Sequence, residues 1–213
     1  MSKPFLSQIL AMTILVAALP ACKKATPTSA SDTTNQSSPN GSPTAGTISV
    51  SPDVTGLASA TNFRFRATGA SDPEGESLIY SWSFGDGSTA SGENASHVFA
   101  LAGTFTVTLT VSDGRSSNTI TEQVTVRDLT GRWRASSGLG VEFLDLRQDA
   151  RDILGTYSNI EVIGNVTGHV ESPRQAVLSI NVPPSTDDVV VEGALDRLIE
   201  ELTFQEGIVF VRQ

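Results

Sequence analysis

The chain has 213 residues, enough for one large domain or two domains of about a hundred residues each, and its formal net charge is −9. Such an acidic balance disfavours binding to nucleic acid or to anionic lipid through charge, because both of these partners are themselves negative. A single cysteine excludes an internal disulfide. We therefore expect two small domains that are each held by their own core, and no nucleic-acid partner.

The N-terminus is typical of an export signal. Lys3 is followed by an almost uninterrupted apolar run from residue 9 to residue 19, which is too short to span a membrane, and then by small residues. Residues 19–22, Leu-Pro-Ala-Cys, resemble the lipobox of bacterial lipoproteins. That resemblance implies a signal peptide over residues 1–21 and a fatty acyl anchor, such as palmitate, on Cys22. The alternative is an ordinary signal peptide cut near Ala21, which would leave Cys22 as a free thiol.

A polar segment follows the cysteine. Residues 23–45 are nearly all Ser, Thr, Pro, Asn, Gly, Ala and Lys, and none is an aliphatic residue larger than alanine. Such a composition cannot bury enough apolar surface to offset the entropy lost on ordering. We predict a lipid-anchored disordered linker over residues 22–45. Lys23 resembles the residue that follows the cysteine in lipoproteins of the outer membrane, which implies an exported protein anchored there or at the cell surface.

Residues 46–127 have the pattern of an all-β domain. Short apolar-polar alternations recur between turn residues, which is typical of a sandwich of antiparallel strands. Phe63, Phe65 and Ala67 alternate with two arginines, and the run 104–111 alternates Thr with Phe105, Val107, Leu109 and Val111. Glu122 interrupts the apolar face of the last strand, which predicts an edge or a bulge there.

Several motifs of this region resemble the PKD domain. They are Ser-Asp-Pro-Glu-Gly at 71–75, Trp-Ser-Phe-Gly-Asp-Gly at 82–87, His-Val-Phe at 97–99 and the run from Ala102 to Gly114. The resemblance implies a seven-stranded immunoglobulin-like sandwich over 46–127 that contacts extracellular protein or carbohydrate. Ser83 stands where the family usually has Asp, and Phe105 stands where it often has Tyr.

Residues 128–213 form a second region of short strands punctuated by glycine. We predict strands at 131–135, 141–148, 153–158, 166–171, 176–182, 189–194, 202–205 and 208–212, forming a small antiparallel β-barrel or meander that closes on itself. A short helix over 194–202 is the alternative for that stretch. Leu-Thr-Gly-Arg-Trp at 129–133 and Gly-Thr-Tyr at 155–157 are similar to small lipocalin-like barrels, which implies a small-ligand site.

The residue types needed for catalysis are sparse. The two histidines, His97 and His169, have no motif of a nucleophilic hydrolase beside them, and no zinc-binding spacing is present. His97 is interpreted as a structural residue of the PKD pattern and His169 as an outward polar residue. The adjacent acids at 187–188 and 200–201 are interpreted as solvated charge, because neighbours on a strand point to opposite faces. We predict that the protein is not an enzyme and has neither a metal centre nor a cofactor.

Calcium is the one cation for which the sequence offers ligands. Asp72 and Glu74 lie together, and Asp86 lies on another turn; oxygen atoms of this kind are what Ca²⁺ prefers. The alternative is that these residues only form turns, since Asp before Pro and Glu before Gly favour turns by themselves. A possible cation site at Asp72, Glu74 and Asp86 is therefore one hypothesis.

Trp133 and Tyr157 are the predicted ligand contacts, since Trp82 is assigned to the core. The resulting function is a non-catalytic, lipid-anchored envelope protein that binds an envelope protein or polysaccharide, or acts as a spacer, through its PKD domain. One alternative is a lipocalin-like barrel that binds a small ligand on a PKD spacer. Others are an accessory module of an extracellular hydrolase system, and a hydrolase built on acids at the barrel mouth.

Overall fold

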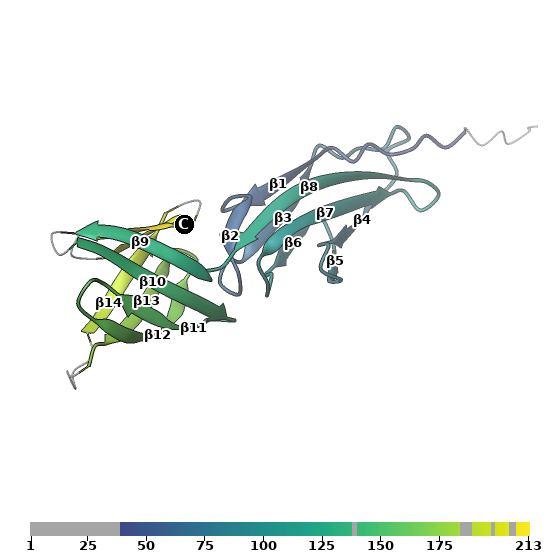
Figure 1. The fold of residues 1–213 in the computed structure, drawn as a ribbon. Coiled ribbons are helices and arrows are strands. Elements are labelled where there is room, and N and C mark those ends of the chain that lie inside the picture. The colour runs from purple at the N-terminus through teal and green to yellow at the C-terminus, as the bar shows by residue number, and fades with distance from the viewer. Residues whose placement is uncertain (1–38, 138–139, 184–188, 197–198, 205–207) are drawn as a thin grey trace, which may run out of the picture. The chain divides into compact units, whose positions relative to one another are not determined.

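The structure, a computed structural model, describes residues 39–137, 140–183, 189–196, 199–204 and 208–213 (Figure 1). Within these ranges every regular element is a β-strand, which confirms the all-β fold class. No helix in the described ranges is long and apolar enough to cross a membrane. The predicted signal peptide, Cys22 and most of the predicted linker lie outside the described residues, as do Asp187 and Asp188.

The first domain is a sandwich of two sheets. Its strands are β1 (Thr47–Ser51), β2 (Thr55–Leu57), β3 (Phe63–Thr68), β4 (Ile79–Ser83), β5 (Thr89–Ser91), β6 (Asn94–His97), β7 (Gly103–Ser112) and β8 (Ser117–Arg127). One sheet has the order β1-β3-β6 and the other the order β2-β8-β7-β4-β5. The structure thus has one strand more than the expected seven. Pro52, which cannot donate to a sheet ladder, separates β1 in the first sheet from β2 in the second.

The predicted inward faces of this sandwich are confirmed. Phe63, Phe65 and Ala67 of β3 are buried, while the two arginines between them are exposed. The Phe65 ring lies 5.9 Å from the Trp82 ring and 5.4 Å from the Phe84 ring, measured between ring centroids. These rings join the two sheets into one core. Glu122 lies on a part of β8 beyond the short stretch that β2 covers, which agrees with the predicted edge.

The first domain begins earlier in the structure than residue 46. Thr44 forms an isolated bridge with Ser71, and Ala45 is buried in the core of the sandwich. Residues 40–44 are held mainly by polar contacts. Their polar composition is therefore like that of the preceding linker, and composition alone does not mark the domain boundary. The domain therefore includes the last six residues of the predicted linker.

The second domain is a closed antiparallel barrel. Its strands are β9 (Gly131–Ser137), β10 (Gly140–Asp149), β11 (Asp152–Ser158), β12 (Ile163–Ser172), β13 (Gln175–Asn181), β14 (Val189–Leu195), β15 (Glu201–Phe204) and β16 (Val209–Arg212). Each strand pairs with the next along the chain, and β16 pairs with β9 to close the ring. The predicted closure is confirmed, and joining the first and last strands of a sheet removes its exposed edges.

The alternative helix over 194–202 is wrong. Strand β14 continues to Leu195 and β15 begins at Glu201. Between them Ile199 has φ +59°, a left-handed value that an α-helix cannot contain. The helical spacing of leucines in this stretch arises because Leu195 and Leu202, paired across β14 and β15, both point into the barrel.

One end of the barrel is filled by side chains. Trp133 is fully buried there, and its indole N–H donates a hydrogen bond to the Leu129 carbonyl oxygen at 3.0 Å. Other buried residues of the interior are Leu144, Leu146, Ile153, Val166, Val170, Ala176, Leu178, Leu195 and Leu202. The opposite end, where β10 and β12 start and β11 and β13 finish, is less completely filled.

Candidate functional site

The less filled end of the barrel contains a cavity of about 400 Å³. Its size falls within the range that small-molecule sites usually have. Nearly all of its lining is apolar, and the exceptions are Glu142, Tyr157 and Glu192. The apolar lining residues are Val162, Ile180, Val182, Val189, Val190, Val191, Phe204, Ile208 and Phe210. An apolar cup with a few polar groups is the usual composition of a site for a small organic ligand.

Glu142 brings a charge into the wall of this cavity. It lies on β10 in the inward row that continues with Leu144 and Leu146, and it is only 4% exposed. Among the residues that the structure describes, it is the only buried residue of an acidic or basic type. Burying a carboxylate is costly unless it has polar partners, so a charge retained at this position calls for a reason.

Tyr157 is one polar partner of Glu142. Burial, followed by the charge of Glu142 and a hydrogen bond to its carboxylate, raises the pKa of the Tyr157 hydroxyl. The Asn159 side-chain amide donates to the Tyr157 oxygen at 3.3 Å. The Tyr157 hydroxyl is therefore held by Asn159 at the β11–β12 turn, and it lies near the Glu142 carboxylate in the cavity wall.

The two aromatic residues predicted to contact a ligand have different positions. Tyr157 is half-buried and lines the cavity, so its place is consistent with that role. Trp133 is fully buried in the filled half of the barrel, so the structure corrects its assignment to a ligand platform. Alternation along Gly131–Ser137 puts Trp133 on the inward row, where a closed barrel covers it on every side.

Sequence analysis missed Glu142, although a signal was present. In the run Glu142, Phe143, Leu144, Asp145, Leu146, the two-residue period puts the glutamate on the same face as the two leucines. A carboxylate on the apolar face of a strand is an anomaly that can be recognised without a structure. Only the closed barrel shows that this face encloses a cavity.

Asp86 and His97 are paired in the first domain. Their side chains approach to 2.6 Å between His97 Nε2 and Asp86 Oδ2, and the Ser88 amide donates to the other oxygen of Asp86 at 2.9 Å. The His97 ring stacks on Phe84 with 4.4 Å between centroids. Burial raises the pKa of the Asp86 carboxyl, but the Ser88 amide and His97 more than offset this and hold the pKa below its usual range. His169, in contrast, is exposed on β12.

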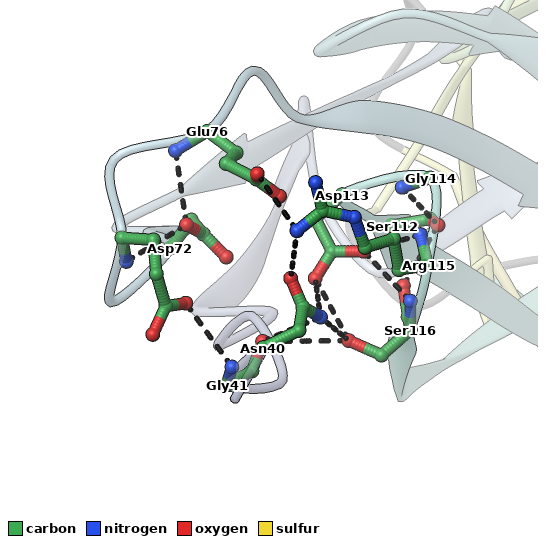
Figure 2. A network of polar contacts seen from close by, with 10 residues as sticks. Asn40, Gly41, Asp72, Glu76, Ser112, Asp113, Gly114, Arg115 and Ser116 are labelled. Carbon is green, nitrogen blue, oxygen red and sulfur yellow. Dashed lines mark hydrogen bonds and ion pairs between the residues drawn. The ribbon is translucent and has the colours of Figure 1, made fainter. Parts of the chain in front are cut away.

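Asp72 belongs to a different polar network, which holds the start of the first domain (Figure 2). Glu74 joins this network through Gly41. Both Oδ1 hydrogen bonds of Asp72 come from backbone amides of its own turn, those of Glu74 and Glu76, each at 2.9 Å. The Glu74 carboxylate accepts a hydrogen bond from the Gly41 amide at 3.1 Å.

The Asp113 turn completes this network. Asp113 Oδ2 accepts a hydrogen bond from the Asn40 side-chain amide at 2.9 Å. Its Oδ1 atom accepts the amides of Arg115 and Ser116 at 2.7 Å each. Hydrogen bonds from the amides of Ser116 and Arg115, and then from Asn40, hold the pKa of Asp113 well below its usual range.

The structure does not bring the three predicted cation ligands together. Asp72 and Glu74 precede β4 and Asp86 follows it, so a strand of roughly 17 Å separates them. Among the described residues no group of three or more His, Cys, Asp or Glu side chains is arranged to hold a metal ion. The trio is therefore corrected to two separate turns. Calcium binding by either turn stays a prediction, which a thermal midpoint measured with and without Ca²⁺ would test.

The outer face of the β1-β3-β6 sheet carries a shallow polar groove. Arg64 and Arg66 project from the central strand β3, and the lining on either side comes from Ser49 and Ser51 of β1 and from Asn94 and Ser96 of β6. Pairing puts Arg64 between Ser51 and Ser96, and Arg66 between Ser49 and Asn94. Arg66 also approaches Glu93 at 3.6 Å, an exposed ion pair of the kind that adds little stability.

Comparison with known proteins supports the predicted family of the first domain. Residues 40–127 match the PKD domain family. The chain is 42% identical over 52 residues to Collagenase ColA of Bacillus cereus, which covers 24% of this chain and 5% of that protein. It is 32% identical over 83 residues to Collagenase ColQ1 of Bacillus cereus, covering 38% of this chain and 8% of that protein. The chain thus spans less than a tenth of the length of either relative.

A solved structure from work on carbohydrate-binding modules of the β-sandwich superfamily is also similar. It has 14% identity and a TM-score of 0.39, and the match covers 83% of this chain and 93% of that one. A likeness at that level supports no conclusion about function. The family match, the ordered motifs and the two-sheet sandwich agree with one another: residues 40–127 of this chain are a PKD domain with an immunoglobulin-like sandwich, and a closed eight-stranded barrel follows it.

Proposed function

We propose that this is an exported, lipid-anchored envelope protein whose barrel binds a small, largely apolar molecule and whose PKD domain is a spacer or contact module. The observation that carries the proposal is the cavity of about 400 Å³ at one end of the barrel. Eight-stranded barrels have an interior just wide enough either to be filled by side chains or to hold one small ligand. This barrel is filled at the Trp133 end and hollow at the other.

Binding of an apolar fluorescent probe tests the cavity. Residues 39–213 form a compact unit and contain both domains, so this fragment is suitable for the measurement. N-phenyl-1-naphthylamine, an uncharged dye that brightens in apolar surroundings, is expected to bind and to brighten. Val191→Phe narrows the cavity and should weaken the dye signal about tenfold or more. Val211→Phe adds the same ring on the outer side of β16 and should leave the signal unchanged. Equal signals from both variants would contradict the proposal.

The lipid anchor is proposed at Cys22. The motif at residues 19–22 and the polar stretch after it support this assignment, and Lys23 supports the outer membrane or the cell surface as the destination. Metabolic labelling with a fatty acid in a bacterial host should mark the full chain. Cys22→Ser should remove the label, whereas retention of label in that variant would place the acyl group elsewhere.

A contact role for the PKD domain is the second candidate, and the Arg64–Arg66 groove favours it. Guanidinium groups pair well with carboxylates and sulfates, and the Ser and Asn side chains around them can bond to sugar hydroxyls. The groove therefore suits an acidic envelope polysaccharide. The similarity to collagenases supports a related possibility, that the domain is an accessory module of a hydrolase system.

Pull-down on an insoluble acidic polysaccharide tests the groove. Arg64→Gln combined with Arg66→Gln should abolish retention. Retention of the unaltered fragment should weaken as salt is raised, because the charged contacts are exposed to solvent. The matched control is Arg151→Gln combined with Arg174→Gln, which removes the same charge from exposed positions of the barrel. Equal loss of retention in both double variants would show that overall charge, not the groove, governs binding.

A further inference from the structure

The polar groups of the barrel cavity restrict which small molecule the cavity can take. This inference rests on the proposed function, since it concerns the ligand of the same cavity. The cavity lining contains two carboxylates, Glu142 and Glu192. Among the lining residues that the structure describes, none is Lys, Arg or His. The charged side chains among these described lining residues are thus both acidic.

The burial of Glu142 strengthens the interaction of its charge with a ligand in the cavity. Glu192 is exposed and close to solvent, which screens it, whereas Glu142 is 4% exposed among apolar side chains. Charges interact several-fold more strongly in such surroundings than in water. A second carboxylate brought next to Glu142 would meet strong repulsion, while a donor or a cation there would be attracted.

Tyr157 lines the same cavity as this acidic group. Tyr157 receives a hydrogen bond from the Asn159 side-chain amide, and burial followed by the nearby charge of Glu142 raises the pKa of its hydroxyl. Oxygen atoms of an ionised carboxyl group can only accept hydrogen bonds. The protein side of the contact is thus an acceptor, and the ligand must supply the donor.

Apolar residues continue from the cavity to the outside of the barrel at the same end. Val189 and Val190 line the cavity and are 60% and 63% exposed. Ile160 and Ile163 flank the lining residue Val162 and are 79% and 69% exposed. Exposed aliphatic side chains at the same end of the barrel as the cavity suit a ligand with an apolar chain longer than the cavity itself.

We propose that the barrel binds an amphiphile with a hydrogen-bond-donating head group, a protonated amine or a hydroxyl, which contacts Glu142 while its apolar chain lies along Val191, Phe204 and Phe210. The same chain ended by a carboxylate is rejected. Glu142 is on this view the residue that determines specificity, and the aliphatic lining supplies most of the affinity.

Competition for the bound dye tests the proposal. A straight-chain alkylamine, the alcohol of equal length and the carboxylate of equal length are each titrated, below the concentration at which they form micelles, into the 39–213 fragment loaded with N-phenyl-1-naphthylamine. The amine should displace the dye at a concentration at least about tenfold lower than the carboxylate, with the alcohol between them. This series uses the unaltered sequence of the fragment and does not depend on the folding of any variant.

Two variants then assign the preference to one residue. Glu142→Gln keeps the shape of the side chain and removes its charge, so the dye should still bind while the amine and the carboxylate become equal competitors. Glu192→Gln removes a charge from the exposed position and should preserve the preference for the amine.

The outcomes separate this inference from the function on which it rests. Dye binding with no preference for the amine, or a preference that survives Glu142→Gln, would overturn the inference and leave the apolar cavity standing. Failure of the dye to bind the unaltered fragment would overturn both.

Discussion

Individual residues of the PKD motif have roles that the structure makes specific. Asp86, in the glycine-rich turn, contacts two groups: one carboxylate oxygen accepts a hydrogen bond from the Ser88 amide, and the other pairs with the His97 ring. His97 in turn packs between Phe84 and Phe99, with ring centroids 4.4 Å and 4.6 Å away. The motif is thus a means of fastening the β4–β5 turn to the aromatic core.

We expect Asp86→Asn to lower the free energy of unfolding by about 1–2 kcal/mol at neutral pH, because a charge-assisted hydrogen bond is lost. The pKa of Asp86 is lower in the folded protein than its ordinary value, so the carboxylate stabilises the fold above about pH 4. This contribution disappears as the pH falls through the lowered pKa. Urea denaturation at a series of pH values should therefore show the two proteins converging in acid.

A double-mutant cycle with His97→Phe is the control for this pair. The phenyl ring keeps the stacking on Phe84 and removes the partner of Asp86. If Asp86→Asn lowers the free energy of unfolding as much in the His97→Phe background as in the natural chain, the interaction between the two side chains is not the source of the lost stability.

Glu142 illustrates how far residue patterns could be read without coordinates. The inward position of Glu142 follows from the alternation with Leu144 and Leu146 and could have been predicted. Its approach to Tyr157, which lies on the next strand, depends on the pairing of Leu144 with Tyr157 across β10 and β11. Register between strands is set by packing and turn geometry together, and no local pattern specified it here.

At the scale of elements, the β4–β5 turn depends on two glycines that differ in their surroundings. Gly85 and Gly87 have φ values of +83° and +94°, which residues with a side chain rarely adopt. A Cβ atom at Gly85 would lie 2.8 Å from the Thr106 carbonyl oxygen on β7, whereas one at Gly87 would meet nothing within 4 Å. The two positions thus share the backbone strain and differ in the steric clash.

Replacement of each glycine by alanine separates these two effects. Gly87→Ala should lower the free energy of unfolding by about 1–2 kcal/mol, because alanine is strained in the left-handed backbone conformation. Gly85→Ala should cost more, because β4 or β7 must also shift to admit the methyl group. Chemical denaturation followed by Trp82 fluorescence, in a Trp133→Phe background where Trp82 is the only tryptophan, measures both losses of stability. Equal losses would mean that the clash is relieved without effect on the sheet.

The segment that precedes β1 is held by the Asp113 turn. We expect Asp113→Ala to free residues 40–44, because the Asn40 side chain and two turn amides lose their acceptor. Hydrogen exchange at the Gly41 and Thr44 amides should quicken in this variant. The natural chain should show the same change in strong acid, since the lowered pKa of Asp113 keeps its carboxylate charged until then.

Asn118→Ala is the comparison for this experiment, because it alters an exposed position on the adjoining strand β8. Exchange that quickens equally in both variants would indicate general loosening of the β7–β8 hairpin rather than release of the N-terminal segment.

Predicted strand limits agreed with the structure wherever alternation was clean. β7 was predicted over Thr104–Val111 and extends over Gly103–Ser112. β12 was predicted from Val166 but begins at Ile163, because Gly164 and the exposed side chains of Ile163 and Asn165 obscure the pattern. Pairing with β11 supplies the hydrogen bonds that extend the strand, and such pairing is not visible in the sequence of one strand alone.

At the scale of the whole molecule, each domain has its own core and its own tryptophan. Trp82 is buried in the sandwich and Trp133 in the barrel, and these are the only tryptophans in the chain. In the Trp82→Phe variant the only tryptophan is Trp133 in the barrel. In the Trp133→Phe variant the only tryptophan is Trp82 in the sandwich. Fluorescence can therefore follow the unfolding of each domain separately.

Leu178→Ala should then destabilise the barrel by about 2–5 kcal/mol, since Leu178 is fully buried in its interior. The denaturation midpoint reported by Trp133 should fall, while the midpoint reported by Trp82 should change little. A matching fall in both midpoints would show that the two cores unfold as a single cooperative unit.

The sequence by itself determined the all-β class, the PKD domain and the eight strands of the barrel, because a two-residue period and glycine-rich turns are local properties of a chain. Tertiary structure decided which predicted residues share a site. It placed Trp133 in the packed half of the barrel, separated Asp86 from Asp72, and set Tyr157 beside Glu142 in the cavity wall. Those outcomes depend on strand register and on the closure of β16 onto β9, which join residues far apart in the chain.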